Sequence, residues 1–297
     1  MEIFINSTKI LYSKPVVEKL TEQALKNIDN LSAKDIVPGL AVVLVGDNPA
    51  SSIYVKNKEK FFLKNGCYSK TFRFQSDISE DDLVSVIKKL NADNQFHGIL
   101  VQLPLPKHID SQSIINHISP LKDVDGFHAE NLGQLFLGNP QFIPCTPYGI
   151  MKLLDYYNIE TSGKHAVIVG RSNIVGKPMA LLLSQTFKNG NATVTICHSK
   201  TDPLEDYTLK ADILIAATGV PKLITSDMVN ENVNIVDVGI NRVEDDSEKG
   251  YYICGDVDFE GCLGNVNSIT PVPGGVGPMT IACLLKNTIE CFKRAKK

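Results

Sequence analysis

Residues 167–178 read VIVGRSNIVGKP, an apolar run that leads through two glycines into a helix-like segment. The stretch first invites comparison with the P-loop, a phosphate-binding turn. Five residues rather than four separate Gly170 from Gly176, however, and Pro178 stands where the P-loop has a Ser or Thr hydroxyl for Mg²⁺. The P-loop interpretation is therefore rejected.

The same stretch also departs from the dinucleotide fingerprint G-x-G-x-x-G, because Ser172 replaces the second glycine and Val175 the third. Its context nevertheless favours a dinucleotide site. An apolar strand ends at Gly170, a helix is expected from Gly176, and a further strand ends at Cys197, which is the spacing of a βαβ unit. On the loop alone, an ordinary βα turn that binds no ligand remains the alternative.

The end of the second strand bears on the choice of cofactor. An NAD site would place Asp or Glu there to accept from the ribose 2′-hydroxyl, but residues 197–201 are Cys-His-Ser-Lys-Thr. Arg171 lies in the preceding turn. Arg, Ser and Lys side chains provide the charge-assisted donors that a 2′-phosphate needs, so we expect NADP rather than NAD.

Strand and helix patterns alternate along the rest of the chain. Short β-branched apolar runs are typical of strands buried on both faces of a parallel sheet, with helices as right-handed crossovers. Strands are expected at residues 39–46, 69–74, 98–103, 164–170, 191–197, 211–218 and 232–239. Helices are expected at residues 15–31, 51–65, 79–93, 176–185 and 279–297, with another starting near Thr146.

This order predicts an α/β fold of two α/β domains. Residues 1–145 are expected to form the first domain and residues 146–277 the second, a Rossmann-like doubly wound parallel sheet. The C-terminal helix, residues 278–297, is expected to pack back on the first domain. A cleft between the two domains is the expected active site.

Composition narrows the class of protein. The 297 residues are 43% hydrophobic and 21% charged with a net charge of −3, so no broad basic field points to nucleic acid. Seven scattered cysteines without CxxC spacing favour reduced thiols in a cytoplasmic compartment over a disulfide framework or a metal site. No apolar run reaches about 20 residues, so a soluble protein without a membrane span is expected.

A lysine-rich helix contains the first candidate for chemistry. Lys56, Lys60 and Lys64 recur every four residues and form one solvated stripe. Lys58 lies about 200° around the helix from Lys56, on the side of Tyr54. It is either a lysine that snorkels to solvent at the edge of the stripe, or a partly buried lysine whose lowered pKa suits proton exchange near neutral pH.

Three further features could complete a site. Gln102 stands among apolar residues near the carboxyl end of a strand, where α/β sheets bind ligands, although a bond to nearby backbone would also explain it. Asp125 is either a turn aspartate or a site residue. The segment 270–280, TPVPGGVGPMT, interleaves glycines and prolines in a shaped loop that suits a ligand or a rigid connector.

Taken together, these stretches resemble the methylenetetrahydrofolate dehydrogenase/cyclohydrolase family. The resemblance runs across nearly the whole chain in family order. Its stretches are YVKNK (54–58), GILVQLPLP (98–106), KDVDGF (122–127), PCTPYG (144–149), GRSNIVGKP (170–178), CHSKT (197–201), ATGVP (217–221), DVGINR (237–242), GDVDF (255–259) and TPVPGGVGPMT (270–280). The opening loop is then a dinucleotide loop of this family's own form, in which Gly176 replaces the usual third glycine after a shift of one residue.

The resemblance implies two reactions of one-carbon folate metabolism in one cleft. The first transfers a hydride from 5,10-methylenetetrahydrofolate to NADP⁺. The second adds water to the resulting 5,10-methenyltetrahydrofolate and opens its ring to 10-formyltetrahydrofolate. The resemblance also implies tetrahydrofolate derivatives as partners, a homodimer, and no nucleic acid, membrane or metal.

The resemblance further implies roles for individual residues. Lys58 is the proton-transfer group, Gln102 tunes it, Tyr54 stacks on the folate and Asp125 binds the pterin ring. The full set of implied folate contacts is Tyr54, Val55, Lys56, Asn57, Lys58, Val101, Gln102, Leu103, Asp125, Pro273, Gly274, Gly275, Val276 and Gly277. The implied NADP contacts are Thr146, Gly170, Arg171, Ser172, Gly176, Ser199 and Ile240.

Two other classes of function stay open at this point. Another two-domain NADP-dependent dehydrogenase, similar to shikimate dehydrogenase, would share the fold but would leave the segment 270–280 and the pair Tyr54 and Lys58 without explanation. A binding protein that senses NADP without chemistry would need no proton carrier, so replacing Lys58 would change nothing measurable.

Overall fold

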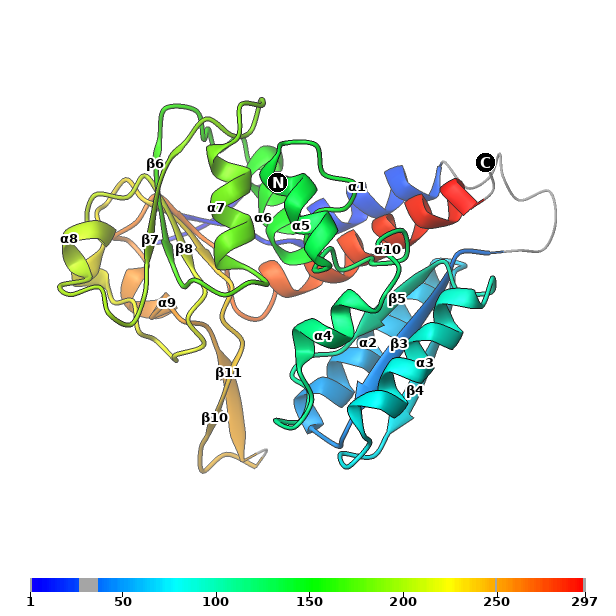
Figure 1. Cartoon of the computed structure of the whole chain (residues 1–297). Coiled ribbons are helices and arrows are strands. Elements are labelled where there is room, and N and C mark those ends of the chain that lie inside the picture. The colour runs from blue at the N-terminus through cyan, green and yellow to red at the C-terminus, as the bar shows by residue number, and fades with distance from the viewer. Residues whose placement is uncertain (1, 27–36, 249, 296–297) are drawn as a thin grey trace. The chain divides into compact units, whose positions relative to one another are not determined.

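A computed structural model describes residues 2–26, 37–248 and 250–295 of the chain. The chain forms two compact units, each built around its own β-sheet (Figure 1). The small-sheet unit comprises Lys19–Cys145 and the chain from Ile281 onward, and the large-sheet unit comprises the chain as far as Glu18 and Thr146–Thr280. The divisions fall within α1 (Lys14–Leu25), α6 (Cys145–Tyr156) and α10 (Val276–Ala295).

The sheet of the small-sheet unit has three parallel strands in the order β4-β3-β5. All seven residues of the central strand β3 are buried, as its continuous apolar sequence predicts. Helices α3 and α4 enclose a core on β3 and β5, and α2 packs against β3 and β4. The elements are β3 (Gly39–Val45), α2 (Pro49–Lys64), β4 (Tyr68–Phe74), α3 (Glu80–Ala92), β5 (Gly98–Val101), α4 (Ser111–Asn116) and α5 (Ala129–Phe136).

Local sequence fixes where the two long helices of this unit begin. The Asn48 side chain accepts from Ser51 N at 3.0 Å, and Pro49 occupies a first-turn position in which its missing N–H costs nothing. The Ser79 side chain caps α3 in the same way, accepting from Asp82 N at 3.1 Å. The first cap fixes where α2 begins. The position of each lysine along the helix then determines the side on which it lies.

The large-sheet unit has a seven-stranded sheet in the order β1-β2-β12-β9-β8-β6-β7. Among the described strands of this sheet, only the pair β1–β2 is antiparallel. β10 and β11 form a separate hairpin. The elements are β1 (Ile3–Ile5), β2 (Thr8–Ile10), β6 (His165–Val169), α7 (Gly176–Ser184), β7 (Thr193–Cys197), α8 (Glu205–Thr208), β8 (Ile213–Ala216), the 3₁₀ turn η1 (Ser226–Met228), β9 (Asn234–Asp237), β10 (Asn241–Glu244), β11 (Tyr251–Cys254), α9 (Phe259–Cys262) and β12 (Ser268–Ile269).

The strand order creates a site-forming edge in this sheet. The chain passes from β6 to β7 on one side and returns to β8 on the other side of β6. Parallel α/β sheets bind ligands at such a switch point, outside the carboxyl ends of the strands. One face of the sheet contributes Val167, Leu214 and Ile235 to a buried core with Cys262 of α9, while α7 packs against β6 and β7 (Figure 1).

One sequence-based assignment differs from the structure. Residues 2–18 were expected in the first domain, but they belong to the large-sheet unit. β2 pairs in parallel with β12, and Leu11 N donates to Ile269 O at 2.8 Å. Strands of three and two residues carry no readable periodicity, and their partners are more than 250 residues apart, so the local pattern does not reveal this pairing.

Several element ends also differ from the sequence-based bounds. Residues 27–31 of the helix expected at residues 15–31 lie outside the described residues, as do the last two residues of the C-terminal helix. That helix begins at Val276, within the glycine–proline segment. β5 ends at Val101, so Gln102 lies just beyond its strand although Gln102 N still donates to Val43 O at 2.9 Å. No helix in the described part of the chain has the length and apolar character of a membrane span.

Candidate active site

Lys58 of α2 is the buried member of its lysine-rich helix. Lys56, Lys60 and Lys64 are exposed, as the solvated stripe predicts. Lys58 is only 3% exposed, so it does not reach solvent in the manner of a snorkelling side chain. A buried ammonium group requires partners, and the small-sheet unit provides them.

The Lys58 ammonium group is held between an amide and an aromatic ring. Its Nζ donates to Gln102 Oε1 at 3.1 Å and lies 4.6 Å from the centroid of the Tyr54 ring, one turn earlier on α2. Gln102 Nε2 donates in turn to Leu103 O at 2.8 Å, which fixes the amide with its oxygen toward the lysine. The amide therefore bonds to nearby backbone, as one sequence-based interpretation expects, and it also contacts Lys58.

Burial and neighbouring charge shift the proton equilibria of this group in opposite directions. Burial lowers the pKa of Lys58, and the nearby carboxylate of Asp125 acts against that shift. Burial also raises the pKa of Asp125, against the influence of the Lys58 charge. The Cys145 thiol hydrogen-bonds to Val124 O at 3.2 Å and has its pKa raised by burial. Burial therefore shifts each of these groups toward its neutral form.

The structure assigns different tasks to the two aspartates of the segment KDVDGF. Asp123 forms the turn: its Oδ1 accepts from Gly126 N at 3.1 Å, and its Oδ2 accepts from His128 N and Asn131 Nδ2, both at 2.8 Å. Asp125, which could have been the turn aspartate, instead interacts electrostatically with Lys58. Sequence reasoning missed the contribution of Asp123, because its partners His128 and Asn131 belong to the following helix α5.

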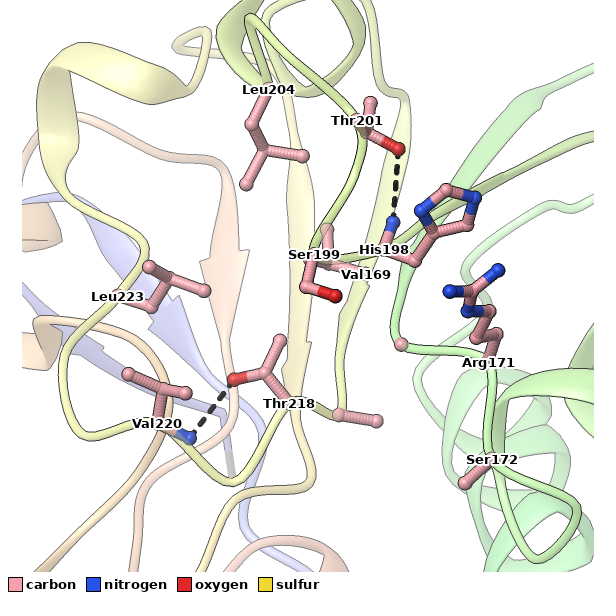
Figure 2. Close-up of a pocket in the computed structure, with 12 residues that line it drawn as sticks. Val169, Arg171, Ser172, His198, Ser199, Thr201, Leu204, Thr218, Val220 and Leu223 are labelled. Atoms are coloured by element: carbon pink, nitrogen blue, oxygen red, sulfur yellow. Dashed lines mark hydrogen bonds between the residues drawn. The ribbon is translucent and has the colours of Figure 1, made fainter.

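A pocket lies at the switch point of the large-sheet unit. It has a volume of about 520 Å³ and lies at the carboxyl ends of β6, β7 and β8 (Figure 2). Its lining residues are Val169, Gly170, Arg171, Ser172, His198, Ser199, Thr201, Leu204, Ala217, Thr218, Val220 and Leu223. One wall carries the side chains of Arg171 and His198, and the opposite wall is formed by the segment from Thr218 to Leu223 (Figure 2).

The two glycines of the β6–α7 turn are required by close backbone contacts. Gly170 has a φ of +133°, and a Cβ placed on it would lie 2.2 Å from Ala217 O. A Cβ on Gly176 would lie 2.1 Å from Gly170 O. Ser172 Oγ accepts from Val175 N at 3.1 Å and so helps to form the same turn. Small residues therefore bring backbone and the N-terminus of α7 close to the pocket.

The pocket fits a dinucleotide phosphate chemically. Arg171 supplies a guanidinium donor set, Ser199 supplies a hydroxyl, and Gly170 leaves the backbone open where a side chain would fill the space. Leu204, Val220 and Leu223 add apolar surface for an aromatic ring. No acidic residue is among those that line the pocket, in keeping with a ligand that carries phosphates.

Four of the seven sequence-based NADP contacts line this pocket: Gly170, Arg171, Ser172 and Ser199. Gly176 does not line the pocket; it lies against Gly170 O, where there is no room for a Cβ. Thr146 Oγ1 and Thr280 Oγ1 share a hydrogen bond of 2.9 Å. Ile240 is 59% exposed, and its Cδ1 lies 3.5 Å from where a Cβ on Gly277 would be.

The pocket also contains residues that sequence reasoning quoted in motifs without assigning them a role. His198 and Thr201 shape the end of β7, since His198 N donates to Thr201 Oγ1 at 3.0 Å. Thr218 and Val220 shape the end of β8, since Val220 N donates to Thr218 Oγ1 at 3.1 Å (Figure 2). Their position directly after predicted buried strands was the signal that could have identified them.

The glycine–proline segment 270–280 is a tightly packed loop in the large-sheet unit. Ser13 donates to Gly274 O through both its backbone N and its Oγ, at 2.9 and 2.8 Å. Gly274 has a φ of +110°, and a Cβ on Gly275 would lie 2.6 Å from Pro271 O. The loop is therefore held in one shape before any ligand arrives. Among the described residues, no group of three or more His, Cys, Asp or Glu side chains could hold a metal ion.

Two family models match the chain, and together they cover most of it. The catalytic domain of tetrahydrofolate dehydrogenase/cyclohydrolase matches residues 11–125, and the NAD(P)-binding domain of the same family matches residues 144–296. The first contains Lys58, Gln102 and Asp125, and the second contains the pocket at the switch point.

Characterised relatives match the chain over almost its full length. The bifunctional protein FolD of Dechloromonas aromatica is 51% identical over 288 residues, which cover 97% of this chain and 98% of the relative. The crystal structure of the bifunctional enzyme FolD from Campylobacter jejuni has a TM-score of 0.89 at 49% identity, covering 96% of this chain and 99% of that one. The FolD enzyme of Trypanosoma brucei, solved with NADP cofactor and inhibitor, has a TM-score of 0.91 at 34% identity, covering 100% and 99%. The chain therefore belongs to the tetrahydrofolate dehydrogenase/cyclohydrolase family.

Proposed function

We propose that this protein oxidises 5,10-methylenetetrahydrofolate with NADP⁺ and hydrolyses the methenyl product to 10-formyltetrahydrofolate. The observation that carries the proposal is Lys58, a buried lysine bonded to a fixed amide and lying against a tyrosine ring, in a chain of this family. The match to relatives described as bifunctional FolD proteins supports both activities.

The hydrolytic step explains why a buried lysine is needed. When water adds to the methenyl carbon, the new C–O bond forms and the water loses a proton. When the ring opens, a C–N bond breaks, the ring nitrogen gains a proton, and the hydroxyl loses its remaining proton as the formyl C=O bond forms, so that one proton is released overall. A base with a pKa near neutrality performs these transfers, and burial moves the pKa of Lys58 in that direction. Gln102 orients the amine through its Oε1, and Asp125 limits the loss of the positive charge.

The oxidative step asks mainly for orientation of two rings. NADP⁺, when bound, supplies the acceptor for the hydride that leaves the methylene carbon. We assign Gly170, Arg171, Ser172 and Ser199 to the binding of its phosphates and ribose, with Gly176 supporting the turn. Thr146 and Ile240 are proposed to contact its nicotinamide half.

We also propose contacts for folate. Tyr54 is assigned to ring stacking and Asp125 to hydrogen bonding with the pterin. The remaining proposed contacts are Val55, Lys56, Asn57, Lys58, Val101, Gln102, Leu103, Pro273, Gly274, Gly275, Val276 and Gly277. The packed shape of the loop at residues 273–277 supports its assignment, because a rigid backbone binds a flat ring at low entropic cost.

We further propose that the protein is a cytoplasmic homodimer. All seven cysteines are buried free thiols, which suits a reducing compartment. The edge strand β1 exposes Ile3 and Phe4, at 46% and 56%, an apolar strip that a second copy would cover. Sedimentation of the purified protein tests the dimer, and a single species of about 33 kDa, the mass of one chain of 32.6 kDa, would contradict it.

The decisive experiment compares Lys58→Met with Lys60→Met, a control at an exposed position on the same helix. Hydrolysis of supplied methenyltetrahydrofolate should fall by about 10² or more in Lys58→Met, the usual contribution of a positioned proton carrier. NADPH affinity should stay unchanged in both variants, because the pocket lies wholly in the large-sheet unit. Equal hydrolysis in the two variants would contradict the proposed role of Lys58. Absence of both reactions in folded wild-type protein would contradict the proposed function itself.

A further inference from the structure

Two buried carboxylates in the large-sheet unit have no part in the chemistry described above. Asp237 ends β9 and is 2% exposed, and Asp256 follows β11 and is fully buried. Neither forms an ion pair with a described residue. Buried charge without a cation is costly, so their hydrogen-bond partners must account for their presence.

The Asp256 side chain bonds to two other segments at this edge of the sheet, the loop after β8 and the start of β10. Its Oδ2 accepts from Thr218 N and from Gly219 N, the latter at 3.0 Å. Its Oδ1 accepts from Asn241 Nδ2 at 2.8 Å. Asp237 helps to hold Asp256 in place, because its Oδ1 accepts from Asp256 N at 2.9 Å. Two of the three contacts of the Asp256 side chain therefore hold the backbone of the loop after β8, and the third holds Asn241, the first residue of β10.

The surrounding glycines indicate that these loops close directly onto the carboxylates. A Cβ on Gly239 would lie 2.1 Å from Asp256 Oδ1, and a Cβ on Gly255 would lie 1.8 Å from Asp237 Oδ2. No ordinary side chain at either glycine is compatible with the present positions of the two carboxylates. The contact is thus a specific close fit rather than a loose bond at the surface.

The loop that Asp256 holds is a wall of the nucleotide pocket. Thr218 lines the pocket next to Ala217, and its Oγ1 accepts from Val220 N, which also lines it (Figure 2). Without Asp256, the N–H groups of Thr218 and Gly219 would be left without these acceptors, and the wall would be free to turn away. Asp256 itself is not among the residues that line the pocket.

We propose that Asp256 is a positioning residue for NADP, which holds the wall from Thr218 to Val220 in its binding shape through backbone hydrogen bonds. The proposal rests on the proposed function, which makes this pocket the NADP site. It predicts an effect on cofactor affinity that spares both the hydrolytic reaction and the preference for NADP over NAD, because the 2′-phosphate is assigned to the opposite wall at Arg171.

The test compares Asp256→Ala and Asp256→Asn with the matched control Asp258→Ala. Asp258 lies two residues further on and makes an ion pair of 3.4 Å with Lys222. Asp256→Ala should raise KM for NADP⁺ and Kd for NADPH by about tenfold or more, since it removes both acceptors of the wall. The value of kcat at saturating NADP⁺, hydrolysis of supplied methenyltetrahydrofolate and the NADP/NAD affinity ratio should all stay within about twofold.

Asp256→Asn is expected to restore most of the affinity. An amide oxygen at the Oδ2 position still accepts from Thr218 N and Gly219 N, and Asn241 can turn its amide to accept from the new NH₂ group. Affinity within about twofold of the control in Asp256→Ala would overturn the proposal. So would an equal loss in the Asn and Ala variants, which would attribute the effect to charge rather than to the two hydrogen bonds.

A measurement on the wild type covers the case in which Asp256→Ala does not fold. Hydrogen exchange should show the amide hydrogens of Thr218 and Gly219 protected in the absence of NADP, although they lie in a loop. Free exchange at both would overturn the proposal. NADPH binding is read directly by fluorescence, so a wild type that binds NADPH without oxidising folate would refute the proposed function and leave this inference testable.

Discussion

At the scale of single residues, the protein contains buried polar groups whose contacts only partly offset the cost of burying them. Lys58 has one amide acceptor and one aromatic face as direct contacts, and burial lowers its pKa against the influence of the Asp125 charge. Asp123 makes the turn bonds, while Asp125 interacts electrostatically with the lysine. Asp123 and Asp125, which lie two residues apart, thus have different surroundings: the first holds a turn and the second lies near Lys58.

The environment of Lys58 predicts how the pH profile of hydrolysis responds to Gln102. The neutral amine is the active base, so the rate falls as pH drops through the pKa of Lys58. Gln102→Leu removes the acceptor that stabilises the ammonium form, which lowers this pKa and moves the acidic limb to lower pH. Gln102→Glu adds a negative charge, raises the pKa and moves the limb to higher pH.

The measurement is the initial rate of methenyltetrahydrofolate hydrolysis against pH, with the rate of Lys58→Met subtracted as background at each pH. Shifts of the same sign in the two Gln102 variants, or no shift in either, would contradict the idea that the amide tunes the lysine.

At the scale of elements, the β6–α7 turn shows how backbone geometry replaces a sequence fingerprint. Only Gly170 occupies its fingerprint position, and the second glycine of the turn, Gly176, is displaced by one residue. Both are nevertheless required by close contacts with backbone oxygens. Ser172, where the fingerprint has a glycine, accepts from Val175 N and shapes the turn in another way. The turn achieves a close approach to its ligand with a different set of residues.

Gly170→Ala is therefore expected to weaken NADP binding by at least about tenfold, because its Cβ would collide with Ala217 O beside the pocket and the backbone would have to move. Gly163→Ala is the matched control, since Gly163 also has a positive φ, +72°, but a Cβ there meets nothing within 4 Å. The control should lose about 1–2 kcal/mol of stability from the left-handed backbone alone and keep its NADPH affinity. Fluorescence titration with NADPH checks both, and an equal loss of affinity would show that strain rather than crowding matters.

At the scale of the whole molecule, the chain carries the nucleotide pocket and the buried Lys58 cluster in different units. The residues around Lys58 all belong to the small-sheet unit, and the pocket at the switch point belongs entirely to the large-sheet unit. Binding of NADP should therefore stabilise the chain irrespective of changes at Lys58. Each site can be disabled without dismantling the core that forms the other.

Thermal unfolding provides the check. At a free NADP⁺ concentration of 100 times Kd, the folded state gains about 2.7 kcal/mol, which raises the unfolding midpoint. Wild type and Lys58→Met should show the same rise, while Gly170→Ala, with a Kd about tenfold higher, should gain only about 1.4 kcal/mol at that concentration. A rise that disappears in Lys58→Met would contradict the independence of the two sites.

The sequence by itself determined the features that repeat locally. Apolar runs with intervening helical periodicity specified the strands and helices of both units, and helical phase separated Lys58 from the exposed Lys56, Lys60 and Lys64. The βα turn at Gly170 and the class of its ligand followed from residue types within one βαβ segment. Each of these inferences needed only neighbours within a few tens of residues.

Tertiary structure alone decided which distant segments meet. It placed residues 2–18 in the large-sheet unit, with β2 beside β12. It gave the turn bonds to Asp123 rather than Asp125, and it buried Asp256 against the wall at Thr218. These arrangements depend on hydrogen bonds between residues from 3 to more than 250 positions apart. Backbone donors and buried carboxylates find such partners only when the sheets have formed, and no local periodicity records which partner that is.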